Sequence, residues 1–334
     1  MFALAFGDAL GKPTEFLDVE QITRRFGPGG PADLPEPALV TDDTQMALAV
    51  GEALVEVLGD APPTAELFAP VLARRFVQWA SSPENNRAPG MTCLRSCGGL
   101  AQGQPWVSAT QPDSKGCGAN MRVTPVGLVP GLADPVRAGL AQLQAALTHG
   151  HPTGLAASEL TAFATWWLND GLDPARLLPA LRDRCREQRA VYREDWLGGL
   201  WARGHDASPA AFIARGWDEC LAALDTVAEA LADPDDDADP CAATGDGWVA
   251  QEALATALHC FLRHPGEPVR VLRRAACTRG DSDSIAALAG AFAGAWHGIE
   301  AFAPDWVARI EYRERLRALG AAWDAPAPAA ASGS

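Results

Sequence analysis

The chain has 334 residues, with 27 lysines and arginines against 42 aspartates and glutamates, so its formal net charge is −15. This balance argues against nucleic acid or an anionic membrane as the main partner, because no excess of basic side chains offsets their phosphates. No apolar run reaches the roughly 18 to 20 residues that a membrane-spanning helix needs. The apolar N-terminus also lacks the basic region of a signal peptide. We therefore expect a cytoplasmic protein that does not enter membranes, with a monomer as the default state.

Apolar residues recur at helical spacing along most of the chain, and the alternation typical of strands is nearly absent. In chain order, the apolar stripes predict helices after Thr64 and at about 140–147, 162–166, 177–181, 221–227, 254–262, 284–299 and 304–320. Pro and Gly cluster between the stripes and predict the connections, at 28–37, 83–90, 103–112, 125–135 and 233–247. The fold is therefore predicted to be all-α, with ten or more helices in one compact domain over residues 1–323. A disordered Ala/Pro/Ser/Gly tail is expected at 324–334.

The eight cysteines show no paired spacing typical of a zinc site. Several lie in helix-like apolar segments, so we expect buried, reduced thiols. The acidic stretch at 233–240 is interpreted as a solvated connection between helices in preference to a cation site.

Two short acidic motifs stand far apart in the chain, TDDT at 41–44 and GDSDS at 280–284, each directly before a helical pattern. Asp, Ser and Thr are the preferred N-cap residues, so helix capping explains either motif taken singly. Together they offer more carboxylates than caps need, and Asp281 and Asp283 can converge in the turn before a helix. Because clustered carboxylates repel one another unless cations lie among them, the pair of motifs predicts a site for Mg²⁺ or Mn²⁺.

A loop shaped by Gly and Pro at 11–15 brings Glu15 as a fifth candidate carboxylate, beside those of the two motifs. Five carboxylates against two divalent ions are close to charge balance, as a two-metal site requires. In the helix after the second motif, Gly290, Gly294 and Gly298 share one face. We expect a neighbouring backbone to approach there closely and to fix the Asp pair in position.

A third candidate is the Gly-rich segment 114–122, whose backbone N–H groups can bind a phosphate, although such loops are more often plain turns. His149 and His151 follow a predicted helix, and a pair of loop histidines is usually structural.

Taken in order, these elements resemble the ADP-ribosylglycohydrolase family. The resemblance rests on GDALG at 7–11 with Glu15, TDDTQM at 41–46, GCG at 116–118 with Met121 and Arg122, Thr148-His149, GW at 247–248 with EAL at 252–254, and GDSDSIA at 280–286. It covers about residues 3–300. It implies a compact all-α fold with two Mg²⁺ or Mn²⁺ ions at its centre. Relatives usually have further residues before GDALG, which predicts a shortened first helix here or a start codon placed too far downstream.

Carried over position by position, the resemblance implies roles for individual residues. The metal ligands would be Thr41, Asp42, Asp43, Asp281, Asp283 and Ser284, with Asp283 bridging both ions and Ser284 standing where most relatives have Thr. Glu15 and Asp283 would be catalytic. The substrate, an ADP-ribose group on a modified protein, would meet Gly116, Cys117, Gly118, Met121 and His149.

The implied reaction is attack of a metal-polarised water on the anomeric carbon of the distal ribose. The acceptor stays open between arginine and serine, because Ser114 occupies a position where some arginine-specific relatives carry an acid. An inactive ADP-ribose-binding or structural member, or a hydrolase of another ADP-ribosyl compound, remains an alternative. Since every metal-ligand position holds an oxygen donor, an enzyme is favoured.

Three rival enzyme classes fit less well. The His205-Asp206 dipeptide of a metal-dependent phosphohydrolase has no matching metal histidines nearby. A haloacid-dehalogenase-type phosphatase needs a strand before Asp281, where 269–276 reads as helical. A prenyl synthase needs DDxxD, and Met46 occupies its last position.

Overall fold

The computed structural model describes residues 1–59 and 61–324. Over these residues the chain forms helices joined by short connections, and its only extended pairings are two isolated bridges, Gln111 with His149 and Gly116 with Val249. The predicted all-α, compact single-domain fold is confirmed. No helix among the described residues is long and apolar enough to cross a membrane. The last helix includes Asp324, and the rest of the predicted tail lies outside the described residues.

The first half of the chain contains nine α-helices within the described residues: α1 (Phe2–Gly11), α2 (Val19–Phe26), α3 (Asp42–Val57), α4 (Ala65–Ala80), α5 (Met91–Ala101), α6 (Trp106–Ala109), α7 (Thr124–Leu128), α8 (Asp134–Ala146) and α9 (Pro152–Asn169). The second half contains α10 (Pro174–Gln188), α11 (Glu194–Leu197), α12 (Pro209–Ala232), α13 (Pro240–Thr244), α14 (Ala250–Arg263), α15 (Pro268–Ala276), α16 (Ser282–His297), α17 (Pro304–Arg309) and α18 (Arg313–Asp324). Short 3-10 helices are η1 (Cys117–Ala119), η2 (Leu200–Arg203) and η3 (Ile299–Ala301).

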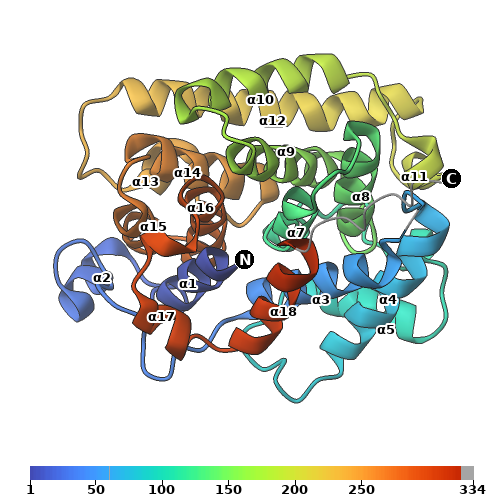
Figure 1. Ribbon diagram of the computed structural model, residues 1–334. Coiled ribbons are helices and arrows are strands. Elements are labelled where there is room, and N and C mark those ends of the chain that lie inside the picture. The colour runs from blue at the N-terminus through green and yellow to red at the C-terminus, as the bar shows by residue number, and fades with distance from the viewer. Residues whose placement is uncertain (60, 325–334) are drawn as a thin grey trace, which may run out of the picture.

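Helices from the two ends of the chain meet in the middle of the molecule. Figure 1 shows α10 and α12 across the top, α9 beneath them, α13 to α16 on one side and α3 to α5 on the other. The N-terminal helix α1 packs along α16, which is the most extensive helix–helix contact in the described structure. Segments that are far apart in sequence are therefore brought together at the ends of these two helices.

Glycines allow α1 and α16 to approach at backbone distance. A Cβ atom on Gly7 would lie 1.9 Å from the carbonyl oxygen of Ala286, and one on Gly290 would lie 2.1 Å from that of Ala3. A Cβ on Gly294 would lie 2.5 Å from the Ala3 Cβ. The close approach predicted for the glycine face is thus confirmed for two of its three members.

Gly298 has a different role from the other two glycines of the pattern. It is the C-cap of α16, with φ of 75°, and a Cβ there would meet no atom within 4 Å. The left-handed backbone at this position favours glycine because L side chains rarely adopt it. Gly298 therefore ends the helix and does not pack against α1.

The predicted helix at 304–320 is interrupted. The chain leaves α17 after Arg309 and enters α18 at Arg313, and between them Tyr312 adopts a φ of 56°. Three of the predicted connections also contain short helices, α6, α7 and α13. Pro lies in the first turn of α7 and α13, where its fixed φ suits the start of a helix. The Pro-rich composition that suggested plain loops is therefore also compatible with short helices.

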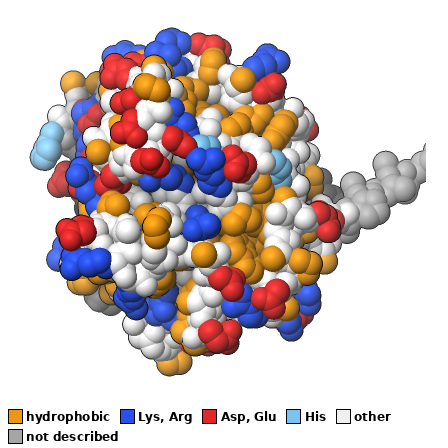
Figure 2. Space-filling model, turned by 90° about the vertical axis from the view of Figure 1, so that its left-hand side faces the viewer, with side chains coloured by type: hydrophobic (Ala, Val, Ile, Leu, Met, Phe, Trp, Pro, Cys, Tyr) orange, Lys and Arg blue, Asp and Glu red, His pale blue; other side chains and the backbone are white. Residues whose placement is uncertain are grey.

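The acidic stretch at 233–240 lies on the surface and is tied to arginines. The Asp236 carboxylate pairs with Arg270 at 2.5 Å and with His264 at 2.9 Å. Figure 2 shows basic and acidic side chains interspersed over this face of the molecule. The arrangement agrees with a solvated connection between helices.

All eight cysteines are buried and free, as expected. Burial raises the pKa of the Cys93 thiol to about 11 and that of the Cys97 thiol to about 12. These thiols are therefore protonated at neutral pH and behave as small apolar side chains.

The glycine contact between α1 and α16 gives a stability prediction. Gly290→Ala places a methyl group 2.1 Å from the Ala3 oxygen and is expected to lower the free energy of unfolding by about 1 to 3 kcal/mol. Gly98→Ala is the matched control, because Gly98 lies in α5 with open space around its Cβ position. This change should raise the free energy of unfolding by about 0.5 to 1 kcal/mol. Urea denaturation measures both, and equal stability of the two variants would contradict the packing argument.

Candidate active site

The first turn of α16 and the loop after α1 bring three carboxylates together. Asp281 is the N-cap of α16, Asp283 lies in its first turn, and Glu15 belongs to the loop that leaves α1. One carboxylate oxygen of each residue lies within 4.8 Å of those of the other two. The hydroxyls of Thr14 and Ser282, 2.9 Å apart, fix the loop to the helix. Two acids that a continuous helix would splay apart thus converge at its start, as predicted.

The TDDT motif forms the start of α3 beside this group. Thr41 is the N-cap, and its Oγ1 accepts a hydrogen bond from the Asp43 N–H at 3.3 Å. The Asp42 and Asp43 side chains are buried, and Asp43 Oδ1 has no hydrogen-bond partner among the described residues. Both carboxylates lie close enough to Asp283 for its charge to raise their pKa values. The two distant motifs therefore form one acidic cluster, defined by Glu15, Asp42, Asp43, Asp281 and Asp283.

The electrostatics of the acidic cluster are those of buried like charges. Burial and the neighbouring carboxylates raise the pKa of Glu15 to about 9 and that of Asp42 to about 7, and they raise those of Asp43 and Asp281 well above the ordinary range. Within the described chain, none of these carboxylates forms an ion pair with a lysine or arginine. Buried hard oxygen ligands with excess negative charge and an unpartnered Oδ1 fit divalent cations.

Asp8 is a residue whose role the sequence interpretation missed. Its fully buried carboxylate lies below the start of α3 and accepts hydrogen bonds from the Thr41 N–H at 2.9 Å and the Thr44 N–H at 3.0 Å. The Thr44 hydroxyl also donates to it, at 2.5 Å. Asp8 thus satisfies the free N–H groups of another helix and fixes the backbone that carries Asp42 and Asp43. Its place in GDALG, one residue after the packed Gly7, was the available signal.

A second anchor holds the segment just before α3. Glu311 Oε2 accepts from the Val40 N–H at 3.0 Å, and Arg87 Nη1 donates to the Val40 carbonyl at 2.5 Å. The two side chains also pair with each other through both terminal nitrogens of Arg87. Both backbone polar groups of the residue before Thr41 are therefore bound by a largely buried ion pair.

The Gly-rich loop lies against the segment before α14. The Cys117 N–H donates to the Trp248 carbonyl at 3.0 Å, and the Ala250 N–H donates to that of Lys115 at 2.8 Å. Met121 is buried, with its sulfur 4.0 Å from the Ser284 hydroxyl. The loop therefore adjoins the start of α16, and with it the acidic cluster.

His149 lies behind the Gly-rich loop and is only 2% exposed. A Cβ on either Gly116 or Gly118 would lie 3.3 Å from its Nε2 atom. The two glycines allow the ring to approach the loop, so the side chain reaches the predicted substrate loop from inside the protein.

Two exposed aromatic rings stack beside the acidic cluster, and the sequence interpretation did not identify them as a pair. Phe16, next to Glu15, is 66% exposed and has a φ of 64°, and Trp248 is 43% exposed. Their ring centroids are 5.6 Å apart and nearly parallel. No pattern in the sequence links the two positions.

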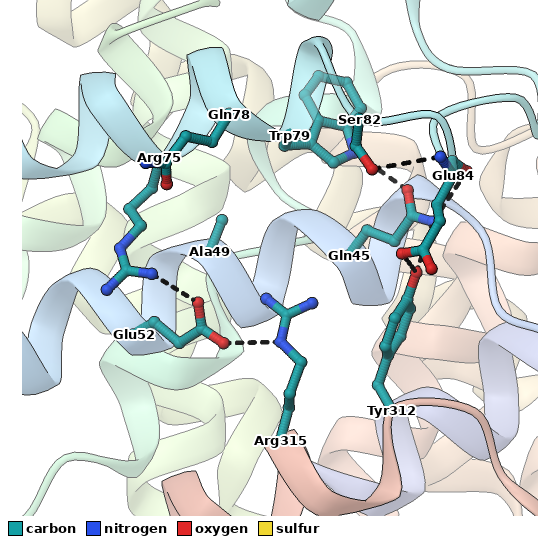
Figure 3. Close-up of a pocket in the computed structure, with 10 residues that line it drawn as sticks. All are labelled: Gln45, Ala49, Glu52, Arg75, Gln78, Trp79, Ser82, Glu84, Tyr312 and Arg315. Carbon is teal, nitrogen blue, oxygen red and sulfur yellow. Dashed lines mark hydrogen bonds and ion pairs between the residues drawn. The ribbon is translucent and has the colours of Figure 1, made fainter.

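A polar cavity of about 190 Å³ lies on α3 between α4 and α18 (Figure 3). Glu52 accepts there from Arg75 at 3.0 Å and from Arg315 at 2.7 Å. Gln45, on the same helix, donates to the Tyr312 hydroxyl at 3.2 Å. Figure 3 shows these side chains turned toward one another, so their hydrogen bonds hold α3 against α4 and α18. No residue of the acidic cluster lines this cavity.

The structure also bears on two rival enzyme classes. Asp206 of the HD dipeptide forms an ion pair with Arg215 at 2.8 Å. The element before Asp281 is the helix α15, where a haloacid-dehalogenase-type site needs a strand. Neither rival site is formed.

The contacts of Asp8 predict a metal-binding defect. Asp8→Asn replaces one acceptor oxygen by an N–H donor that faces other donors, so the affinity for Mn²⁺ should fall about 10- to 100-fold. Titration calorimetry measures it. Asp173→Asn is the control, because Asp173 is the N-cap of α10, outside the acidic cluster, and its replacement should leave the affinity unchanged. An unchanged affinity in Asp8→Asn would show that Asp8 does not position the carboxylates of Asp42 and Asp43 for a cation.

The raised carboxyl pKa values predict how pH affects the metal-free protein. Glu15 keeps its proton in the folded state up to a pKa of about 9, whereas in the unfolded chain it ionises near 4.5. The stability that it contributes is full below pH 4.5 and is lost as the pH rises toward 9. With EDTA the melting temperature should therefore fall over this range. Mn²⁺ should raise it more at about pH 8 than at about pH 5.5, because protons compete with the metal. An equal rise at both pH values would contradict this view.

Comparison with known proteins identifies the family. The model of the ADP-ribosylglycohydrolase family matches residues 1–330. A solved structure described as an ADP-ribosylglycohydrolase-related protein complex superimposes with a TM-score of 0.67 and 26% identity, over 96% of this chain and 94% of that one.

Curated relatives agree. The chain is 26% identical to human ADP-ribosylhydrolase ARH3, over 94% of this chain and 88% of that protein. It is 32% identical to the ADP-ribosyl-[dinitrogen reductase] glycohydrolase of Rhodospirillum rubrum, over 46% of this chain and 51% of that protein. A 33% match to an Archaeoglobus fulgidus protein likewise spans about half of that relative, 49%. With the family model covering nearly the whole chain, and with the all-α fold in place, this protein belongs to the ADP-ribosylglycohydrolase family of hydrolases.

Proposed function

We propose that this protein uses two divalent cations, Mg²⁺ or Mn²⁺, to hydrolyse the glycosidic bond between the distal ribose of ADP-ribose and a modified acceptor. The observation that carries the proposal is the acidic cluster, in which oxygens of Glu15, Asp281 and Asp283 lie within 4.8 Å of one another beside a glycine-rich loop. Buried carboxylates of this density need cations, and a neighbouring loop of backbone amides suits a diphosphate.

The diphosphate would be bound by uncharged donors. The backbone N–H groups of Gly116 and Gly118 donate to no backbone oxygen within the described chain, so they remain for a ligand. Cys117 and Met121 connect this loop to Ser284 and thereby to the acidic cluster. The loop would therefore hold the diphosphate while the distal ribose reaches the carboxylates.

The proposed metal ligands are Thr41, Asp42, Asp43, Asp281, Asp283 and Ser284, with Asp283 shared between the two ions. When bound, the cations supply Lewis-acid polarisation of a water and of the ribose hydroxyls. Glu15, on the loop that faces the start of α16, would take a proton from the attacking water and pass it to the acceptor as the glycosidic bond breaks. The four aspartates of the cluster are buried, which would limit the access of bulk water to the reacting carbon.

The acceptor is a modified side chain of a protein. The relatives' names point to ADP-ribosylated substrates, including a modified dinitrogen reductase for the Rhodospirillum rubrum enzyme. The exposed and stacked rings of Phe16, next to Glu15, and Trp248 would offer an apolar contact to the acceptor. Position 114 holds Ser, so the loop has no carboxylate there to bind the guanidinium of an arginine acceptor. The residues therefore do not choose between arginine and serine, and the test includes both acceptors. We further propose that the protein acts in the cytoplasm as a monomer.

The activity test uses peptides that carry ADP-ribose on arginine or on serine, with Mn²⁺ or with EDTA. Mass spectrometry measures the released ADP-ribose. We expect release from one of the two peptides with Mn²⁺ and no release with EDTA. Binding of ADP-ribose without release from either peptide would favour an inactive binding member or a hydrolase of another ADP-ribosyl compound.

Two variants separate the proposed roles. Asp283→Ala should abolish both turnover and Mn²⁺ binding, because one carboxylate serves both ions. Glu15→Gln should lower kcat by about 10²- to 10⁴-fold while Mn²⁺ still binds. Glu20→Gln, at an exposed position on α2, is the control and should leave both quantities unchanged. Wild-type turnover in Glu15→Gln would remove Glu15 from the catalytic residues.

A further inference from the structure

Arg122 is a buried charged side chain that forms no ion pair with a carboxylate among the described residues. It is fully buried, and its guanidinium lies over the Phe76 ring at 4.3 Å. Its nitrogens donate to the side chain of Gln144 at 2.9 Å, to the Gln144 carbonyl at 2.7 Å and to the Thr148 hydroxyl at 2.7 Å. Burying a guanidinium that is bound only by neutral groups lowers the stability of the fold. Its position next to the Gly-rich loop therefore suggests a role in the site.

The direction of these hydrogen bonds fixes the direction of the next one. An arginine cannot accept a hydrogen bond, so Thr148 Oγ1 accepts from Arg122 and its own hydrogen must go elsewhere. Two acceptors are near it, His149 Nδ1 at 2.8 Å and the Ala145 carbonyl at 3.5 Å. That carbonyl already accepts from the N–H groups of Thr148 and His149. The contact to Nδ1 is much the shorter and its acceptor is free, so the hydrogen of the hydroxyl is assigned to His149 Nδ1.

His149 is consequently neutral, with its hydrogen on the other ring nitrogen. A ring nitrogen that accepts a hydrogen bond carries no proton, which leaves Nε2–H in the neutral imidazole. Burial and the nearby charge of Arg122 lower the pKa of His149 well below its usual value, so the ring does not become a cation at neutral pH.

The Nε2–H group faces the Gly-rich loop and has no partner among the described residues. Nε2 lies 3.3 Å from the Cβ positions of both Gly116 and Gly118. The side chain is 2% exposed, so its surroundings fix the orientation of the ring.

We propose that Arg122 and Thr148 are positioning residues that fix His149 as the Nε2–H tautomer, so that this nitrogen donates to a diphosphate oxygen bound at the loop. The diphosphate part of this inference rests on the proposed function, whereas the tautomer is a property of the ligand-free chain. A neutral donor keeps the same hydrogen-bonding pattern over the pH range in which a free histidine would change its charge.

The first test is ¹⁵N NMR of ligand-free protein labelled at its six histidines, with the His149 signals assigned by their loss in His149→Gln. We expect a protonated Nε2 and an unprotonated Nδ1 at pH values on both sides of the ordinary histidine pKa, about 6.5. A protonated Nδ1, either in the other tautomer or in an imidazolium, would overturn the proposal.

The second test compares two substitutions of Thr148, whose hydroxyl links Arg122 to His149. Thr148→Val keeps the shape but removes the hydroxyl, and should weaken ADP-ribose binding about five- to tenfold, with the His149 Nδ1 signal shifted. Thr148→Ser keeps the hydroxyl and should restore both the affinity and the signal. An equal loss of affinity in both variants would show that the shape of the Thr148 side chain matters and that its hydrogen bond to His149 does not.

ADP-ribose titration of the wild-type protein separates this inference from the proposed function. A change of the His149 Nε2 signal on binding is expected. Binding that leaves this signal unchanged would exclude the donor role while the proposed function stands. Absence of any ADP-ribose binding would instead refute the proposed function, and the NMR result on the free chain would still decide the tautomer.

Discussion

The contact between α1 and α16 is the constraint on which the site depends. Glycines let the two helices approach at backbone distance, since a Cβ on Gly7 or Gly290 would overlap a carbonyl of the other helix. The loop after α1 and the first turn of α16 then lie next to each other, and Glu15 meets Asp281 and Asp283. A side chain at either glycine would separate the helices, and the carboxylates with them.

Bringing these carboxylates together opposes folding, because buried like charges repel and lose hydration. The protein offsets this by holding the backbone that carries them. Asp8 binds the N–H groups at the start of α3, and the Arg87–Glu311 pair binds both polar groups of Val40. The polar network around Glu52 braces α3 from its other side. Rigid ligands with excess negative charge favour cations that complete the site.

The same arrangement explains how a chain with a net charge of −15 can be suited to an anionic ligand. Next to the acidic cluster the protein presents backbone N–H groups and an oriented imidazole, and a buried arginine, Arg122, acts on the imidazole through Thr148. Neutral donors can bind a diphosphate by geometry without attracting the carboxylates that the proposed metal ions would need. In the proposed site, the cations would bind the distal ribose, and the dipoles of N–H groups would bind the diphosphate.

The sequence by itself determined the helical class, the start of α4 after Thr64, the buried thiols and the two acidic motifs, because these depend on local periodicity, capping and composition. It also carried the family resemblance. Only the tertiary structure decided what depends on contacts between distant segments: the cap that Asp8 gives to α3, the anchor at Val40, the Phe16–Trp248 pair, and the end of α16 at Gly298. The tautomer of His149 belongs here too, since it follows from a hydrogen bond that begins at Arg122. A residue's neighbours along the chain determine its tendency to form a helix. The hydrogen-bond partner of a side chain depends instead on which helix packs against it.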